Sequence, residues 1–157
     1  MGIGAAGAWR NVDKEAAMIR PLDHTADVGF ELVADTLEAL FSGAARGMFA
    51  LIEGVEEDQE PQPADMARTS IGIACTGDDL AELLVAWLRE LLWLHDDRAL
   101  VFRDAHFQWL DERALRARVE LAVASRSPVR EIKGVTYHGL MARRSGSRLH
   151  ARIIFDV

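Results

Sequence analysis

Apolar positions recur along the chain with two periods, and each period predicts a type of element. In residues 35–54 the spacing is three or four, which predicts a helix with one buried face. A capping box formed by Asp35 and Glu38 is expected to begin it. A second helix is predicted to begin at Asp79 and to end at residues 95–97. Because the second helix is apolar around most of its circumference, we expect it to be central in the fold.

The other apolar runs alternate or are short, which predicts strands. Consecutive strands are separated by short connections, which predicts largely antiparallel pairing. The predicted fold class is therefore α+β, with two helices packed on a largely antiparallel sheet. The order of elements also suggests a duplicated strand–helix–strand unit. The predicted strands are residues 19–22, 28–34, 69–75, 101–109, 115–123, 135–141 and 149–155.

A length of 157 residues predicts one domain. We assign this domain to residues 18–157 and expect residues 1–17 to be a flexible N-terminal extension, with Met18 as an alternative start. Residues 53–67 contain six acids, two prolines and no Lys or Arg, which predicts an exposed acidic loop.

The acidic loop accounts for most of the net charge of −7. Without it, 18 basic and 19 acidic side chains leave −1. This balance argues against a nucleic-acid groove as the main function, because phosphate binding depends on clustered Lys and Arg. The local arginine patch in residues 143–152 is interpreted as a solvated hairpin surface, with contact to RNA or an acidic partner as the alternative.

The single cysteine, Cys75, excludes an internal disulfide, fits a reducing compartment and is expected to be a small core residue. No apolar run reaches the roughly 18–20 residues that span a bilayer, and the N-terminus lacks the basic region of a signal peptide. We therefore expect a cytoplasmic protein with no membrane partner.

The residues best suited to bind a cation or transfer a proton lie near both ends of the chain. Asp23, His24 and Asp27 directly precede the second predicted strand, and the last predicted strand is followed by Asp156 and Val157. Carboxylates and imidazoles bind divalent cations or transfer protons. If the two strands are neighbours, the carboxylates of Asp27 and Asp156 and the terminal carboxylate converge. Oxygen ligands without a Cys/His set favour Ca²⁺ or Mg²⁺ over zinc.

Several motifs occur together in this chain. They are Asp-His-Thr-Ala-Asp-Val-Gly at 23–29, Thr-Leu-Glu-Ala-Leu-Phe at 36–41, Ala-Ala-Arg-Gly-Met-Phe at 44–49, Leu-Leu-Val-Ala-Trp-Leu-Arg-Glu-Leu-Leu at 83–92, Ile-Lys-Gly-Val-Thr-Tyr-His-Gly-Leu at 132–140 and Phe-Asp-Val at 155–157. In combination they resemble the archease family over residues 19–157.

This resemblance implies a small metal-binding cofactor of the RtcB-type RNA ligase, which takes part in tRNA splicing and RNA repair. Such a protein is not an enzyme; it promotes formation of the ligase–GMP intermediate and supports multiple turnover. The resemblance implies that Asp27, Asp156 and Val157 hold the cation. RNA is then contacted only indirectly, through the ligase. The chain has no phosphate loop or glycine-rich fingerprint, so we expect no nucleotide to bind it alone.

Four further residues are candidates for lining the site, orienting ligands or contacting the ligase: Asp23, His24, Lys133 and His138. For the two histidines a satisfied structural role is an equal alternative. For Lys133 the alternative is a solvated cation at a strand end.

Two other functions are compatible with the same residues. The first is a metal-dependent hydrolase or nuclease in which Asp27 and Asp156 hold the metal and His24 acts as a base. The second is a chaperone-like binding module that recognises a partner through apolar surface and needs no metal.

Overall fold

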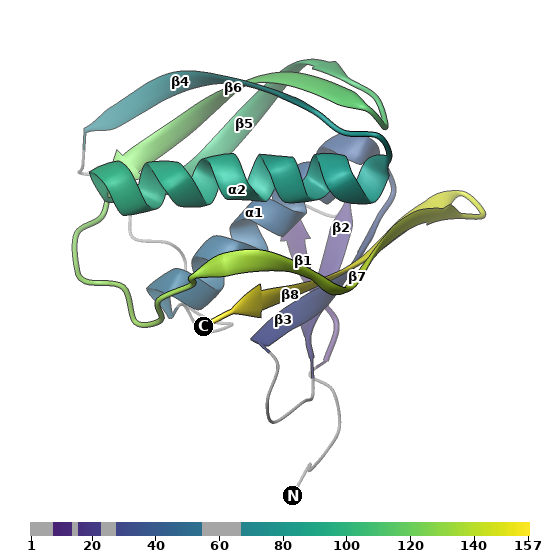
Figure 1. Ribbon diagram of the computed structural model, residues 1–157, viewed down its shortest axis with the longest axis horizontal. Helices are drawn as coiled ribbons and strands as arrows, with labels where there is room; N and C mark the ends of the chain where they lie inside the picture. The colour runs from purple at the N-terminus through teal and green to yellow at the C-terminus, as the bar shows by residue number, and fades with distance from the viewer. Residues whose placement is uncertain (1–7, 14–15, 23–27, 55–66) are drawn as a thin grey trace, which may run out of the picture.

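The computed structural model describes residues 8–13, 16–22, 28–54 and 67–157. In these residues two helices and eight strands form an α+β fold, as predicted (Figure 1). The elements are β1 (Arg10–Asp13), β2 (Ala17–Pro21), β3 (Val28–Ala34), α1 (Leu37–Glu53), β4 (Arg68–Thr76), α2 (Leu80–Arg98), β5 (Leu100–Leu110), β6 (Ala114–Val123), β7 (Gly134–Ser145) and β8 (Arg148–Asp156).

The strands form two sheets, whereas the sequence suggested one. The larger sheet has the order β1-β2-β3-β8-β7, and the smaller one has the order β4-β6-β5. All of their pairings are antiparallel, as predicted. β1 was not predicted, because its residues lie in the segment expected to be a flexible extension; it pairs with β2 at the edge of the larger sheet. The larger sheet therefore contains the first three strands and the last two.

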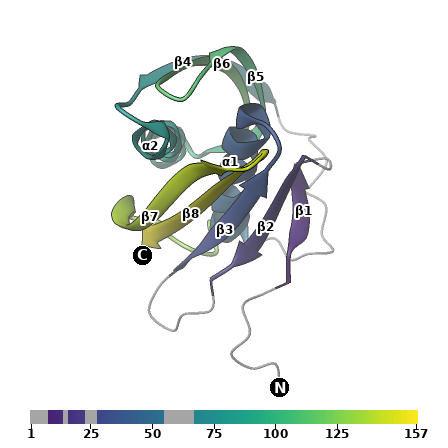
Figure 2. The same ribbon diagram turned by 90° about the vertical axis from the view of Figure 1, so that its right-hand side faces the viewer.

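Both helices lie between the two sheets (Figure 2). This position explains why α2 is apolar on most sides, as its sequence indicated. It also corrects the prediction that α1 has one buried face, because α1 is covered from both sides and even its small residues are buried. The buried positions of α1 are Ala39, Leu40, Phe41, Ser42, Gly43, Ala44, Ala45, Gly47, Met48, Phe49 and Ile52.

The cap of α1 differs from the prediction. Thr36 is the N-cap, and its hydroxyl accepts a hydrogen bond from the backbone N–H of Ala39 at 3.1 Å. Asp35 lies one residue earlier, where its own N–H donates to the carbonyl of Ala16 at 2.9 Å. Asp35 therefore lies outside the helix, and its carboxylate is 3.4 Å from the Nε of Arg148. Gly54 ends α1 in a left-handed conformation, as predicted.

The cap of α2 is confirmed, but its end is not. The Asp79 carboxylate accepts from the N–H of Glu82 at 2.9 Å. The helix continues through residues 95–97, which were expected to end it, and terminates at Ala99 with φ 55°. The N–H of Ala99 donates to the carbonyl of His95 at 2.8 Å, and the His95 Nδ1 is 3.0 Å from the carbonyl of Leu100.

Gly29 is required where β3 passes β8. A Cβ at this position would lie 2.1 Å from the carbonyl oxygen of Ile153, which is backbone and cannot rotate away. We expect Gly29→Ala to reduce the free energy of unfolding by about 3 kcal/mol, at the upper end of the usual cost of overpacking. Urea-induced unfolding followed by circular dichroism measures this change.

Gly72→Ala is the matched control, because a Cβ there meets nothing within 4 Å. Alanine loses less backbone entropy on folding than glycine, so this variant is expected to be slightly more stable, by about 0.5–1 kcal/mol. Equal destabilisation by both substitutions would contradict the proposed clash.

No helix in the described residues is both long and apolar enough to cross a membrane.

Candidate metal centre

The end of β8 is fixed by both neighbouring strands. Val28 at the start of β3 lies opposite Phe155, and Gly134 at the start of β7 lies opposite Asp156. The backbone N–H of Lys133 also donates to the carbonyl of Asp156 at 2.7 Å. The backbone at the end of the chain is therefore held on two sides, close to the start of β7 (Figure 1).

Three predicted site residues, Asp23, His24 and Asp27, lie outside the described residues. Val28, the residue that follows Asp27, begins β3. The condition on which the predicted site depended is confirmed, since β3 and β8 are neighbouring antiparallel strands. The convergence of the carboxylates themselves stays a prediction.

Asp156 and Val157 fit a cation site in their exposure and chemistry. Both are exposed at the end of the chain. Within the described parts of the chain, no side chain pairs with the Asp156 carboxylate. Its Oδ2 lies 3.8 Å from the place where a Cβ on Gly134 would be, which is ordinary van der Waals contact. A side-chain carboxylate and a terminal carboxylate are the hard oxygen donors that Ca²⁺ and Mg²⁺ prefer.

Lys133 and His138 are placed differently. Lys133 is exposed and directly precedes β7, where its backbone bonds Asp156. His138 lies where the register of β7 and β8 shifts between Thr136 and Met141, and its N–H donates to the Thr136 hydroxyl at 3.0 Å. The structure therefore brings Lys133 beside Asp156 and leaves His138 exposed further along β7.

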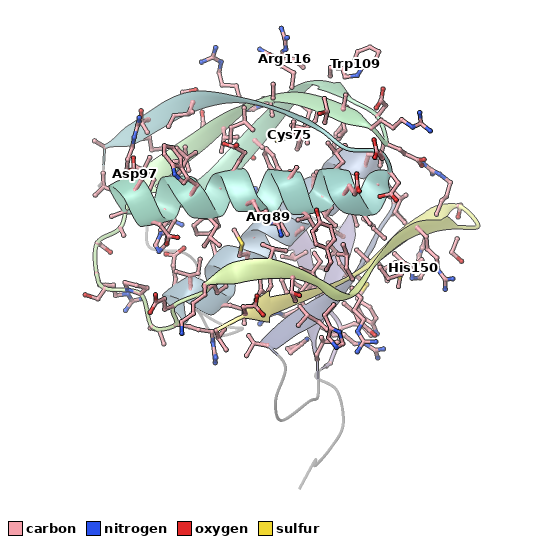
Figure 3. The ribbon with its side chains drawn as sticks, viewed as in Figure 1. Cys75, Arg89, Asp97, Trp109, Arg116 and His150 are labelled. Carbon is pink, nitrogen blue, oxygen red and sulfur yellow. The ribbon has the colours of Figure 1, made fainter. Side chains whose placement is uncertain are left out.

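Arg89 is a supporting residue that the sequence did not reveal. It extends from α2 towards β7 (Figure 3), donates to the carbonyl of Val135 at 3.1 Å and lies 5.0 Å from the centre of the Tyr137 ring. It thereby ties the start of β7, which contains Gly134, to the central helix. Arg89 and Val135 are 46 residues apart, so no local pattern indicates this contact.

A second group of potential ligands lies on the smaller sheet. Ligand atoms of Asp104, His106 and Glu120 lie within 4.8 Å of one another. Both carboxylates already have arginine partners, with Arg46 at 3.3 Å from Asp104 and Arg68 at 3.4 Å from Glu120. We therefore interpret the group as an ion-pair network. Sequence reasoning missed it because β5–β6 pairing alone brings the two acids together.

Cys75 is buried on β4, as predicted for a core residue. Burial, and to a smaller extent the charge of Glu90, raises the pKa of its thiol to about 11. Only the thiolate is nucleophilic, so at pH 8 roughly one molecule in a thousand is reactive. We expect iodoacetamide to label Cys75 at least ~100-fold more slowly in the folded protein than in urea, with the rate rising towards pH 11. Mass spectrometry measures both rates; equal rates would contradict the assignment.

Comparison with known sequences gives consistent matches over nearly the whole domain. The model of the Archease protein family matches residues 20–157. The protein archease of Pyrococcus furiosus is 32% identical over 142 residues, which cover 86% of this chain and 95% of that protein. The protein archease of Methanopyrus kandleri is 33% identical over 145 residues, which cover 87% of this chain and 96% of that protein.

Two solved structures have a similar fold. A solution structure of protein 1598 of Methanobacterium thermoautotrophicum has a TM-score of 0.63 at 26% identity and covers 87% of this chain and 96% of its own. A crystal structure of an archease from Thermotoga maritima, described as a possible chaperone, has a TM-score of 0.59 at 18% identity and covers 87% of this chain and 95% of its own. The matched family model and these relatives together show that this chain belongs to the archease family.

Proposed function

We propose that this protein is a non-catalytic, metal-binding activator of an RtcB-type RNA ligase. It promotes guanylylation of the ligase and allows multiple turnover. Membership of the archease family supports this class of function. The structural observation that carries the proposal is the pairing of β3 with β8, which ends at the exposed Asp156 carboxylate and the chain terminus.

In this proposal Asp27, Asp156 and the terminal carboxylate of Val157 hold a divalent cation, Ca²⁺ or Mg²⁺. When bound, the cation supplies positive charge that attracts phosphate oxygens. The chain's own residues shape the place where this charge is held. The Lys133 N–H fixes the carbonyl of Asp156, and Arg89 fixes the start of β7 through Val135.

The protein would act by docking beside the ligase active site and presenting the carboxylates there. Docking in this way assists loading or exchange of the ligase's own metal, or favours the ligase conformation that accepts GTP. The exposed cation of Lys133 lies on the same end of the fold and is a candidate contact for the ligase. The protein is expected in the cytoplasm, since its lone thiol fits a reducing compartment.

The test is guanylylation of the cognate ligase under multiple turnover with GTP and metal. Three reactions are compared: no addition, wild-type protein and Asp27→Ala. We expect stimulation by the wild type and none by the variant, because removing one carboxylate ligand weakens cation binding. A circular dichroism spectrum checks that the variant is folded.

Other outcomes separate the alternatives. Stimulation by both proteins would remove Asp27 from the mechanism and favour a chaperone-like docking module, the role for which the Thermotoga maritima relative is described as a possible candidate. Stimulation by neither, with folded protein and active ligase, would reject activation. Metal-dependent cleavage of RNA by the purified protein, lost in Asp27→Ala, would then favour a hydrolase.

A further inference from the structure

The outer face of the β4-β6-β5 sheet is uncovered, because both helices lie on its inner side (Figure 2). Residues that alternate along β6 show this division. Leu115, Ala117 and Val119 are buried against the helices, whereas Arg116 and Arg118 between them are exposed.

An aromatic ring and an arginine form a pair on this face. Trp109 of β5 lies opposite Arg116 of β6, and both point away from the helices (Figure 3). Trp109 is 61% exposed, which is unusual for so large an apolar side chain. Its Nε1 donates to Asp111 at 3.2 Å. The N–H groups of Arg113 and Ala114 hold the pKa of Asp111 below its usual range, so this acceptor is ionised at neutral pH.

Small residues leave space beside this pair. On β4, Ala74 lies opposite Arg116 and Gly72 lies opposite Arg118. A Cβ added at Gly72 would meet nothing within 4 Å. The result is an open groove of about 470 Å³ next to the Trp109 ring. Its lining includes Ala74, Thr76, Gln108, Trp109, Ala114 and Arg116.

Arg116 is the charged side chain in the lining of the groove, and the carboxylate of Asp111 accepts from the Trp109 ring. The acids Asp104 and Glu120, further along the strands, are each paired with an arginine. Arg118 bonds only the hydroxyl of Ser70, at 3.4 Å, among the described residues. Arg116 has no anionic partner in the described part of the chain. The guanidinium group of Arg116, opposite the ring, and that of Arg118, two residues further along β6, are therefore available to an anionic ligand.

We infer that this face binds single-stranded nucleic acid, with a base stacked on Trp109 and phosphates contacted by Arg116 and Arg118. A flat ring supplies sequence-independent stacking, and arginines along a groove follow the backbone. The sequence favoured only indirect contact with RNA. That expectation came from the family resemblance, and the separate argument against a nucleic-acid groove used the charge balance of the chain, which does not show that the arginines of β6 share one face.

The test uses the purified protein alone, without ligase. Fluorescence anisotropy of a labelled uridine RNA of about 10 nucleotides gives the dissociation constant, and thymidine DNA of the same length gives the comparison. Trp109→Ala is expected to raise the dissociation constant roughly 5- to 150-fold. Trp109→Phe keeps a stacking ring and is expected to stay near the wild type. Arg116→Ala should lower the salt dependence, log K against log[salt], by about 0.7.

Matched substitutions elsewhere are the controls. Trp93→Ala removes a 57% exposed tryptophan from α2, and Arg143→Ala removes an exposed arginine from β7; both should bind like the wild type. Binding should also persist in EDTA and in Asp156→Asn, which keeps this test independent of the metal site. Binding of either RNA or DNA that is lost in Trp109→Ala supports the inference. Failure of both oligonucleotides to bind, or an equal loss in Trp93→Ala, overturns it.

Discussion

Replacement of Trp87 by alanine is expected to destabilise the fold by about 4 kcal/mol, within the range measured for truncating buried aromatic residues. Trp87 lies on α2 between the two sheets and is fully buried. Its ring packs against Phe41 of α1 and Phe107 of β5, with centroids at 6.3 and 5.4 Å. Its Nε1 also donates to the carbonyl of Phe41 at 2.9 Å. The substitution removes packing against α1 and β5 and one buried hydrogen bond.

Thermal unfolding followed by circular dichroism measures this effect. A loss of about 4 kcal/mol corresponds to a fall in Tm of roughly 8–16 °C for a chain of this size. Trp93→Ala makes the same chemical change on the same helix, but this side chain is 57% exposed. It is expected to change stability by less than about 0.5 kcal/mol. Similar melting temperatures for the two variants would contradict the central position of Trp87.

The second large effect is expected at the end of the chain and depends on the proposed metal site. Asp156→Asn should weaken binding of Ca²⁺ or Mg²⁺ by at least about 100-fold, because loss of a direct ligand costs more than the 10- to 100-fold typical of its supporting residues. Adding one glycine after Val157 should also weaken binding, since it moves the terminal carboxylate. Isothermal titration calorimetry measures both affinities.

The fold should tolerate both changes, because Asp156 and Val157 are exposed. Asp97→Asn is the matched control: it makes the same change at a carboxylate on α2, whose side chain is 51% exposed (Figure 3). It should leave cation affinity unchanged. If Asp97→Asn weakened binding as much as Asp156→Asn, the cation would be attracted by the overall negative charge and not by a site at the chain end.

The helices and most strands could be predicted because their signals are local. The three-to-four spacing in α1 and α2, the alternation in β6 and the Asp79 cap depend on residues close in sequence. The predictions of the α1 cap and of residues 10–13 were wrong, because contacts with residues distant in the sequence determine both. The N–H of Asp35 bonds Ala16 and its carboxylate pairs with Arg148, while Thr36 caps α1. Residues 10–13 form a strand because β2 offers them an edge.

The sequence predicted the residue types of the candidate site and the condition that β3 and β8 are neighbours. It did not predict the contacts that hold the strands of the site in place. Motifs at both ends of the chain indicated the carboxylates, and the register confirms that their strands are adjacent. The contact of Arg89 with Val135 depends on α2 crossing β7, which no sequence period encodes. Because residues 23–27 are outside the described parts, the full ligand set remains a prediction.

By itself, the sequence determined the type of nearly every element, the α+β class and the motifs that identify the archease family. Only the tertiary structure decided that there are two sheets with the helices between them, that Gly134 pairs with Asp156 and that Trp109 stands next to Arg116. The physical reason is the range of the interactions. Helix and strand periods follow from backbone geometry over a few residues, whereas strand partners and layer order depend on which apolar faces, far apart in the chain, cover each other.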